Sequence, residues 1–63
     1  MRLFCYYKHV NNEDVMFYPT KIGDRSDGVT FYIGWWVNNS KKVLSYDIIE
    51  IPSEEEDKWI VKD

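Results

Sequence analysis

Apolar and aromatic side chains fill residues 29–37 at every position except Thr30 and Gly34. In a strand, successive side chains point to opposite faces, so this segment has two faces to compare. We expect the face with five large apolar residues to be buried, and the face with threonine, glycine and two aromatics to be exposed. The expected buried set is Val29, Phe31, Ile33, Trp35 and Val37. The expected exposed set is Thr30, Tyr32, Gly34 and Trp36.

Turn-forming residues divide the rest of the chain into short alternating segments, which is typical of a small antiparallel sheet. The polar run 11–14 ends a first strand, and Pro19, which has no N–H to donate, ends a second. The loop 20–28 closes on an Asp-Gly turn, and residues 38–41 form a hairpin loop. We therefore expect five strands, at residues 2–10, 15–18, 29–37, 42–51 and 58–62.

Two further strands have faces that can be assigned in the same way. In residues 42–51, Leu44, Tyr46 and Ile48 are expected to point inward. Ile49 and Ile51 do not fit the same alternation, so we expect a bulge near residues 48–49 that turns them inward as well. In residues 2–10, the less charged face is expected to be internal. It carries Leu3, Cys5, Tyr7 and His9.

Residues 53–57 carry signals for helix. Ser53 stands three residues before Glu56, a capping-box spacing, and the acids favour a first helical turn. The β-rich triplet 59–61 argues against a longer helix. We expect one helical or 3-10 turn at 53–57 and a short strand after it.

These elements predict an all-β fold with one small domain over residues 1–63. Five short antiparallel strands with a turn of helix before the last one favour a strongly curved sheet or an SH3-like barrel. A chain of 63 residues buries only about 60% of the surface that its unfolded form exposes. Large aromatics compensate for a small core, because each buries roughly 150–250 Å².

Charge is unevenly distributed along the chain. The net charge is −3, yet residues 1–42 carry six basic groups against four acidic ones, and residues 43–63 carry seven acidic groups against two basic ones. An acidic chain repels nucleic acid at long range, so a nucleic-acid role would rest on the N-terminal part. The single Cys5 cannot form an internal disulfide and suits a reducing compartment. With no signal-peptide pattern and no run of transmembrane length, we expect a cytoplasmic protein that does not enter a membrane.

The sequence offers no catalytic constellation, so we expect a protein that is not an enzyme and that needs no cofactor or metal. His9 and Cys5 lie four residues apart, roughly 13 Å along a strand, too far to share a metal or a proton. The loop 23–28 lacks the ligand spacing of a calcium loop and the following helix of a phosphate loop. A solvated turn explains it.

The expected function is binding of another protein. A target protein with a basic surface is one form that this partner could take. Aromatics are the residues that most often carry binding energy at interfaces. The expected contacts are Tyr32, Trp36 and Tyr18, with Glu54, Glu55 and Glu56 steering the encounter. An adaptor or inhibitor of the kind made by phages and mobile elements fits this size and charge. A homodimer that hides the aromatic patch is a further alternative.

The second hypothesis is binding of single-stranded nucleic acid. It rests on one alternating face of residues 2–10, where aromatics flanked by cations form a stacking platform. That face carries Arg2, Phe4, Tyr6 and Lys8. The orientation of these four side chains separates the two hypotheses, because a shared positive exposed face favours nucleic acid.

Overall fold

Three ten-residue strands carry most of the sheet. The computed structural model describes residues 1–62 and places five antiparallel strands in one sheet, in the order β4-β3-β2-β1-β5. A 3-10 turn, η1, lies between the last two strands, and no long helix occurs in the described part of the chain. The elements are β1 (Tyr6–His9), β2 (Val15–Asp24), β3 (Val29–Asn38), β4 (Val43–Pro52), η1 (Ser53–Lys58) and β5 (Trp59–Lys62).

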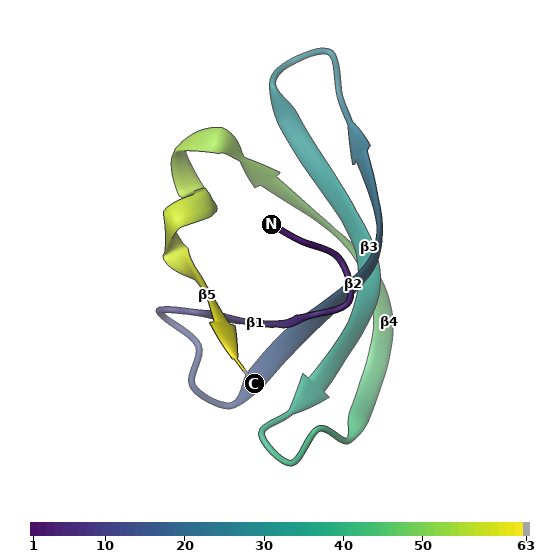
Figure 1. Cartoon of the computed structure of the whole chain (residues 1–63), viewed down its shortest axis with the longest axis vertical. Coiled ribbons are helices and arrows are strands. Elements are labelled where there is room, and N and C mark those ends of the chain that lie inside the picture. Colours follow the sequence, from purple (N-terminus) through teal and green to yellow (C-terminus); the bar gives the residue numbers. More distant parts are fainter. Residues whose placement is uncertain (63) are drawn as a thin grey trace.

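The sheet is strongly curved and open. The long strands β2, β3 and β4 bend together as one layer, and β1, β5 and η1 lie on its concave side (Figure 1). The N-terminal segment lies between η1 and the long strands. Strands β4 and β5 form the two ends of the strand order and do not pair with each other. The prediction of five antiparallel strands is confirmed, and closure into a barrel is not observed.

Strand β2 continues through Pro19, so the expected stop at that residue was wrong. Pro19 is buried opposite Gly34, and the register with β3 shifts between Pro19 and Lys21. Thr20, the extra residue, donates its hydroxyl to the Ile33 carbonyl at 3.1 Å. A bulge of this kind accommodates proline within a ladder. Most of the predicted loop 20–28 is therefore strand.

Strand β1 is shorter than expected because the backbone turns sharply at Phe4. Phe4 has a φ of 62°, a left-handed conformation that is unusual for a bulky residue. Its N–H donates to the Pro19 carbonyl at 2.8 Å, which ties this kink to β2. Regular pairing of the chain begins only at Tyr6.

The two faces of β3 are inverted relative to the sequence prediction. Tyr32 is 1% exposed and belongs to the core, whereas Trp35 is 38% exposed. We call the concave side of the sheet the inner face. Its core cluster is Phe17, Tyr32 and Ile51, with Met1, Trp36, Ile49 and Trp59 packed against it.

The inversion has a steric and a polar cause. Gly34 lies between Tyr32 and Trp36 on the inner face, and its lack of a side chain lets β2 approach closely. The polar atoms of the two aromatics are also satisfied there. The Tyr32 hydroxyl lies 3.4 Å from the Met1 amino nitrogen, and Trp36 Nε1–H donates to Asp47 Oδ2 at 3.2 Å.

Strand β4 follows the same inversion. Tyr46 and Ile48, expected inward, are 50% and 58% exposed, and Leu44 is exposed as well, while Ile51 is buried. The irregularity of β4 is not at residues 48–49. It lies near its start, where Trp36 pairs with Ser45 and Val37 with Val43, which leaves Leu44 without a partner. Burial of Val37 and Tyr7 was predicted correctly.

The 3-10 turn is confirmed at Ser53–Lys58, but the capping box is not. Pro52 occupies the N-cap position, and no side-chain hydrogen bond caps the turn. Ser53 is already the first residue of η1. Proline just before the turn supplies a fixed backbone angle in place of a side-chain cap.

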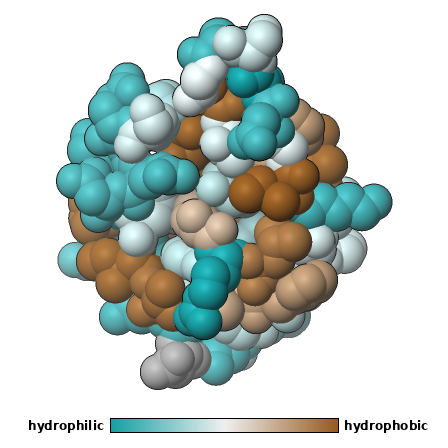
Figure 2. Space-filling view, turned by 45° about the horizontal axis from the view of Figure 1, so that its top comes forward, coloured by the Kyte–Doolittle hydropathy of each residue, from teal (hydrophilic) through white to brown (hydrophobic). Residues whose placement is uncertain are grey.

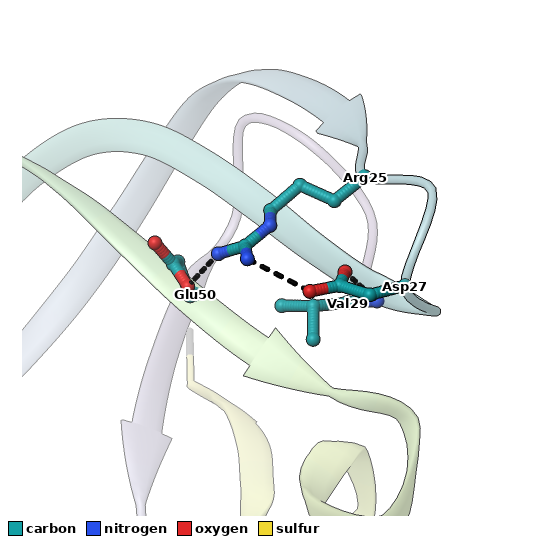
Figure 3. A network of polar contacts seen from close by, with 4 residues as sticks. All are labelled: Arg25, Asp27, Val29 and Glu50. Atoms are coloured by element: carbon teal, nitrogen blue, oxygen red, sulfur yellow. Dashed lines mark hydrogen bonds and ion pairs between the residues drawn. The ribbon is translucent and has the colours of Figure 1, made fainter.

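An exposed ion-pair network ties the β2–β3 turn to β4 (Figure 3). The Arg25 guanidinium contacts the Glu50 carboxylate and, at 2.7 Å, the Asp27 carboxylate. Asp27 also accepts the Val29 N–H at 3.3 Å through its other oxygen. All three charged side chains are about half exposed, so the network is expected to add little free energy of folding.

Across residues 1–62, no helix has the length and apolar character needed to cross a membrane.

Candidate binding surface

Four aromatic side chains form a row across the convex side of the sheet, which we call the outer face. Tyr18 pairs with Trp35, and Trp35 pairs with Tyr46, so the three lie side by side on neighbouring strands. Tyr7 pairs with Phe17, which puts the preceding Tyr6 opposite Tyr18. We refer to this set as the aromatic row: Tyr6, Tyr18, Trp35 and Tyr46.

Ring contacts hold the row together at both ends. The ring centroids of Trp35 and Tyr46 are 4.5 Å apart with an interplanar angle of 63°. Those of Tyr6 and Tyr18 are 4.9 Å apart. Offset and edge-to-face pairs of this kind each contribute about 0.5–1.5 kcal/mol beyond their buried area. The contacts therefore position the row without burying it.

The β3–β4 end of the row continues as an apolar patch. Ile33 pairs with Ile48 directly beside the Trp35–Tyr46 pair, on the same face. Trp35, Tyr46 and Ile48 are exposed, and Ile33 is half-buried. We call these four residues the apolar patch. Figure 2 shows that hydrophobic residues reach the surface in separate areas of the molecule, divided by hydrophilic ones.

The β1–β2 end of the row is cationic. Lys41 Nζ lies 5.1 Å from the centroid of the Tyr6 ring, a distance at which a cation–π interaction forms. Lys62 is opposite Tyr6 in the β1–β5 register and shares its face, as does Lys8 two residues along β1. The Phe4 side chain is 63% exposed. Its ring packs edge-to-face with the Tyr18 ring, and the two ring centroids are 6.4 Å apart.

Of the residues expected to bind a protein through aromatic contacts, only Tyr18 lies on the outer face. Tyr32 is in the core, and Trp36 packs at 5.0 Å against Phe17 and at 6.3 Å against Trp59 on the inner face. Their side chains stabilise the concave layer in this structure. The interpretation of Tyr32 and Trp36 as an exposed pair was wrong because the inner and outer faces were exchanged.

The acidic residues of η1 lie on the inner side of the sheet, away from the aromatic row. Glu56 is close enough to Tyr32 to influence its ionisation. Burial raises the pKa of the Tyr32 hydroxyl above its ordinary value of 10.0, and the negative charge of Glu56 raises it further. Glu54 is exposed, and Glu55 makes a 3.9 Å ion pair with Lys58. Whether these acids steer a partner stays a prediction.

The four residues of the nucleic-acid hypothesis are brought together only in part. The kink at Phe4 breaks the alternation, so they do not form one continuous strand face. Tyr6 and Lys8 share the outer face of β1, and the Phe4 ring joins Tyr18 there. Lys8 Nζ is engaged with the Glu13 carbonyl at 2.5 Å and with Asn39 Oδ1 at 3.2 Å. Arg2 is exposed.

The sequence did not predict that Trp35, Tyr46 and Ile48 form part of the exposed outer face. The alternation did reveal that these three residues share a face. What it could not reveal was the side of the sheet on which the N-terminal segment, η1 and β5 pack.

His9 and Cys5 have ordinary surroundings. The His9 ring meets Trp59 edge-on at 5.0 Å, and its Nδ1 accepts the Asn11 N–H at 3.1 Å. Cys5 is a half-buried free thiol. In residues 1–62 there is no group of three histidine, cysteine or acidic side chains placed to hold a metal, and no pocket is found.

Comparison with known proteins gives no match to a family model, to a curated protein or to a solved structure.

Proposed function

We propose that this chain is a noncatalytic protein-binding module that contacts its target through the apolar patch of Ile33, Trp35, Tyr46 and Ile48. The observation that carries the proposal is the exposed Trp35–Tyr46 pair, which lies beside Ile33 and Ile48. Exposed aromatics in a continuous apolar surface are typical of interface hot spots. Scattered exposed apolar residues would need no such explanation.

The module is proposed to have an SH3-like fold. Its proposed role is that of an adaptor or inhibitor of the kind made by phages and mobile elements, and its proposed location is the cytoplasm. The strand order and the 3-10 turn before β5 support the fold assignment. The unpaired Cys5 supports a reducing compartment. Because the acids of η1 are on the other side from the patch, their proposed role is long-range attraction to a basic target.

A quantitative binding measurement tests the proposal. A partner captured from the native host is purified, and its affinity is measured by surface plasmon resonance for wild type and for Trp35→Ala with Tyr46→Ala. We expect the double variant to bind at least about 30-fold more weakly, since a hot-spot truncation costs about 2 kcal/mol. Ile48→Ala should also weaken binding.

Ile22→Ala is the matched control. Ile22 is an exposed strand isoleucine like Ile48, but it points to the inner side, opposite Tyr32. The control should bind like wild type. Equal affinity of wild type and the Trp35→Ala, Tyr46→Ala variant for the purified partner would contradict the proposal.

A second candidate function, binding of single-stranded nucleic acid, is favoured by the cationic end of the row. Tyr6 has Lys41 over its ring and Lys62 on the same face, beside the stack with Tyr18. Aromatic stacking contributes about 1–3 kcal/mol per base, and lysines add a salt-dependent term.

Fluorescence anisotropy with a labelled oligothymidine separates the two candidates. Nucleic-acid binding predicts an affinity that falls steeply with salt and is lost in Tyr6→Ala and Lys41→Ala. Lys58→Ala, on η1, is the control for net charge. Salt-insensitive or undetectable binding would rule this candidate out.

A further inference from the structure

Strand β4 is a long edge of the sheet. Within residues 1–62 it ends the strand order and has ten residues, whereas the opposite edge, β5, has four. An edge of this length presents N–H and C=O groups to which a strand of another chain can pair. Exposed apolar side chains such as Tyr46 and Ile48 increase that risk. The outward backbone groups of β4 therefore decide whether another chain can add to this sheet.

The pairing of β4 with β3 shows which of its backbone groups point outward. The Ile33 carbonyl accepts the Thr20 hydroxyl at 3.1 Å and therefore points toward β2. Ile33 directs its N–H to the same side, so its partner Ile48 directs its own backbone groups away from β3. Alternate residues of a strand share a side, so Tyr46 and Glu50 also direct their backbone groups outward.

Asp47 binds the central outward donor of this edge. The Ile48 N–H donates to Asp47 Oδ1 at 2.8 Å. Asp47 pairs with Gly34 on the inner face, and its Oδ2 accepts the Trp36 Nε1–H at 3.2 Å. The indole thereby fixes a carboxylate beside the backbone of the edge. A strand that paired with β4 would have to break the Ile48 bond and bring a carbonyl oxygen close to that carboxylate, which is unfavourable.

Both ends of β4 are also unsuited to pairing. Near its start, the irregularity that leaves Leu44 without a partner interrupts the regular edge. At its end, Pro52 shares the outward side with Glu50 and has no N–H to donate. With the Ile48 N–H bound by Asp47, the outward donors that are left between Tyr46 and Pro52 are those of Tyr46 and Glu50, four residues apart.

We propose that Asp47 blocks the addition of a further strand to β4, a strand of a second copy of this chain included. Its carboxylate occupies the position that the carbonyl of a pairing strand needs, and Trp36 holds it there. The apolar patch on the outer face stays open to a partner while the edge beside it is closed. The inference does not rest on the proposed function, because Asp47 lies on the inner face and is not part of the patch.

Self-association of an Asp47 variant tests the proposal. Sedimentation velocity is measured from low to high micromolar concentration for wild type and Asp47→Ala. We expect Asp47→Ala to associate at least about tenfold more strongly than wild type, because its Ile48 N–H can bond directly to the carbonyl of an added strand. A folded Asp47→Ala protein that associates no more strongly than wild type would overturn the proposal.

Two controls match the other effects of this substitution. Trp36→Phe removes the donor that bonds to Asp47 Oδ2 and leaves Asp47 in place. Asp57→Ala makes the same change of net charge at an exposed position of η1. Both should associate like wild type, and circular dichroism should show that each variant is folded. Association of either control as strong as that of Asp47→Ala would contradict a specific role of Asp47.

A second substitution identifies the surface through which Asp47→Ala associates. When Asp47→Ala is combined with Ile48→Pro, residue 48 has no N–H to donate, and association should return to the wild-type level. When Asp47→Ala is combined with Ile48→Ala, the same side chain is lost from the apolar patch but the N–H is kept, so association should persist. Equal association of the two double variants would place the contact outside the β4 edge and overturn the proposal.

Hydrogen exchange of the wild-type protein gives a test that needs no variant. The Ile48 amide should exchange more slowly than the amides of Tyr46 and Glu50, which point outward on the same edge, because Asp47 holds it. An Ile48 amide that exchanges as fast as these two would show that Asp47 does not hold the donor, and the proposal would then be wrong.

Discussion

Gly34 lies against the backbone of Tyr18 on the neighbouring strand, so closely that a Cβ on residue 34 would be 2.1 Å from the Tyr18 carbonyl oxygen. The same Cβ would be 2.7 Å from Pro19 Cα. Both contacts are to backbone, which cannot move aside by rotating a side chain. This close approach lies between the two inner aromatics, Tyr32 and Trp36.

Replacing Gly34 by alanine is therefore expected to destabilise the fold. A buried methyl group with no room costs about 1–3 kcal/mol through strain, which outweighs the usual gain of alanine over glycine in a strand. Urea unfolding followed by circular dichroism measures the change. Gly23→Ala is the control, because the atoms nearest its Cβ belong to the far end of the half-buried Phe31 side chain, which can shift as a whole to make room. A Gly34→Ala protein as stable as wild type would show that the strands separate readily.

Trp35 and Phe17 are expected to respond very differently to truncation. Phe17 is fully buried in the core cluster, so Phe17→Ala should cost about 3–5 kcal/mol and leave the domain largely unfolded. Trp35 packs mainly on Tyr46 at the surface, and Trp35→Ala should cost about 1–2 kcal/mol. Thermal melts of both variants test this. A larger loss of stability for Trp35→Ala than for Phe17→Ala would support the assignment made from the sequence, in which Trp35 points into the core.

The sequence predicts which of these residues share a face of the sheet, but not which face is buried. Alternation correctly grouped Ile33 and Trp35 on one face and Tyr46 and Ile48 on one face, and the structure pairs the two groups across β3 and β4. Period two is a local property, so the grouping and the strand count could be read from sequence. Which group faces the core depends on where η1, β5 and the N-terminus pack, and that is a long-range property.

Turn chemistry had a similar limit. Pro19 was expected to end a strand because it lacks an N–H, and locally that argument holds. The fold keeps the strand by inserting Thr20 and bonding its hydroxyl to Ile33. Phe4 carries no signal for a left-handed backbone, and the bond from its N–H to Pro19 becomes visible only in three dimensions.

The ion pair of Arg25 with Glu50 is expected to contribute little to stability. Both side chains are about half exposed, and pairs of this kind contribute about 0–1 kcal/mol and weaken with salt. Glu50→Gln should therefore lower the free energy of unfolding by less than about 1 kcal/mol. Urea titrations at low and high salt measure it, and a large salt-independent loss would mean that Glu50 has a structural role beyond this pair.

Tyr32 should make the fold sensitive to alkaline pH. In the folded chain, burial and then Glu56 raise its pKa above the unfolded value of 10.0. Between these two pKa values the folded state holds a proton that the unfolded state has released, so the free energy of unfolding falls as pH rises. The contribution is fully present below pH 10.0 and is lost as pH rises through the folded pKa.

The test compares urea unfolding at about pH 8 and about pH 11 for wild type and Tyr32→Phe. Tyr32→Phe should reduce the fall in the free energy of unfolding between these two pH values, because no hydroxyl then ionises in the core. Glu56→Gln should flatten it in part by removing one cause of the raised pKa, whereas Glu54→Gln, an exposed acid on the same turn, should not. Tyr46→Phe, which changes an exposed tyrosine, should keep the wild-type slope. An alkaline loss of equal size in Tyr32→Phe and wild type would place its origin in another group.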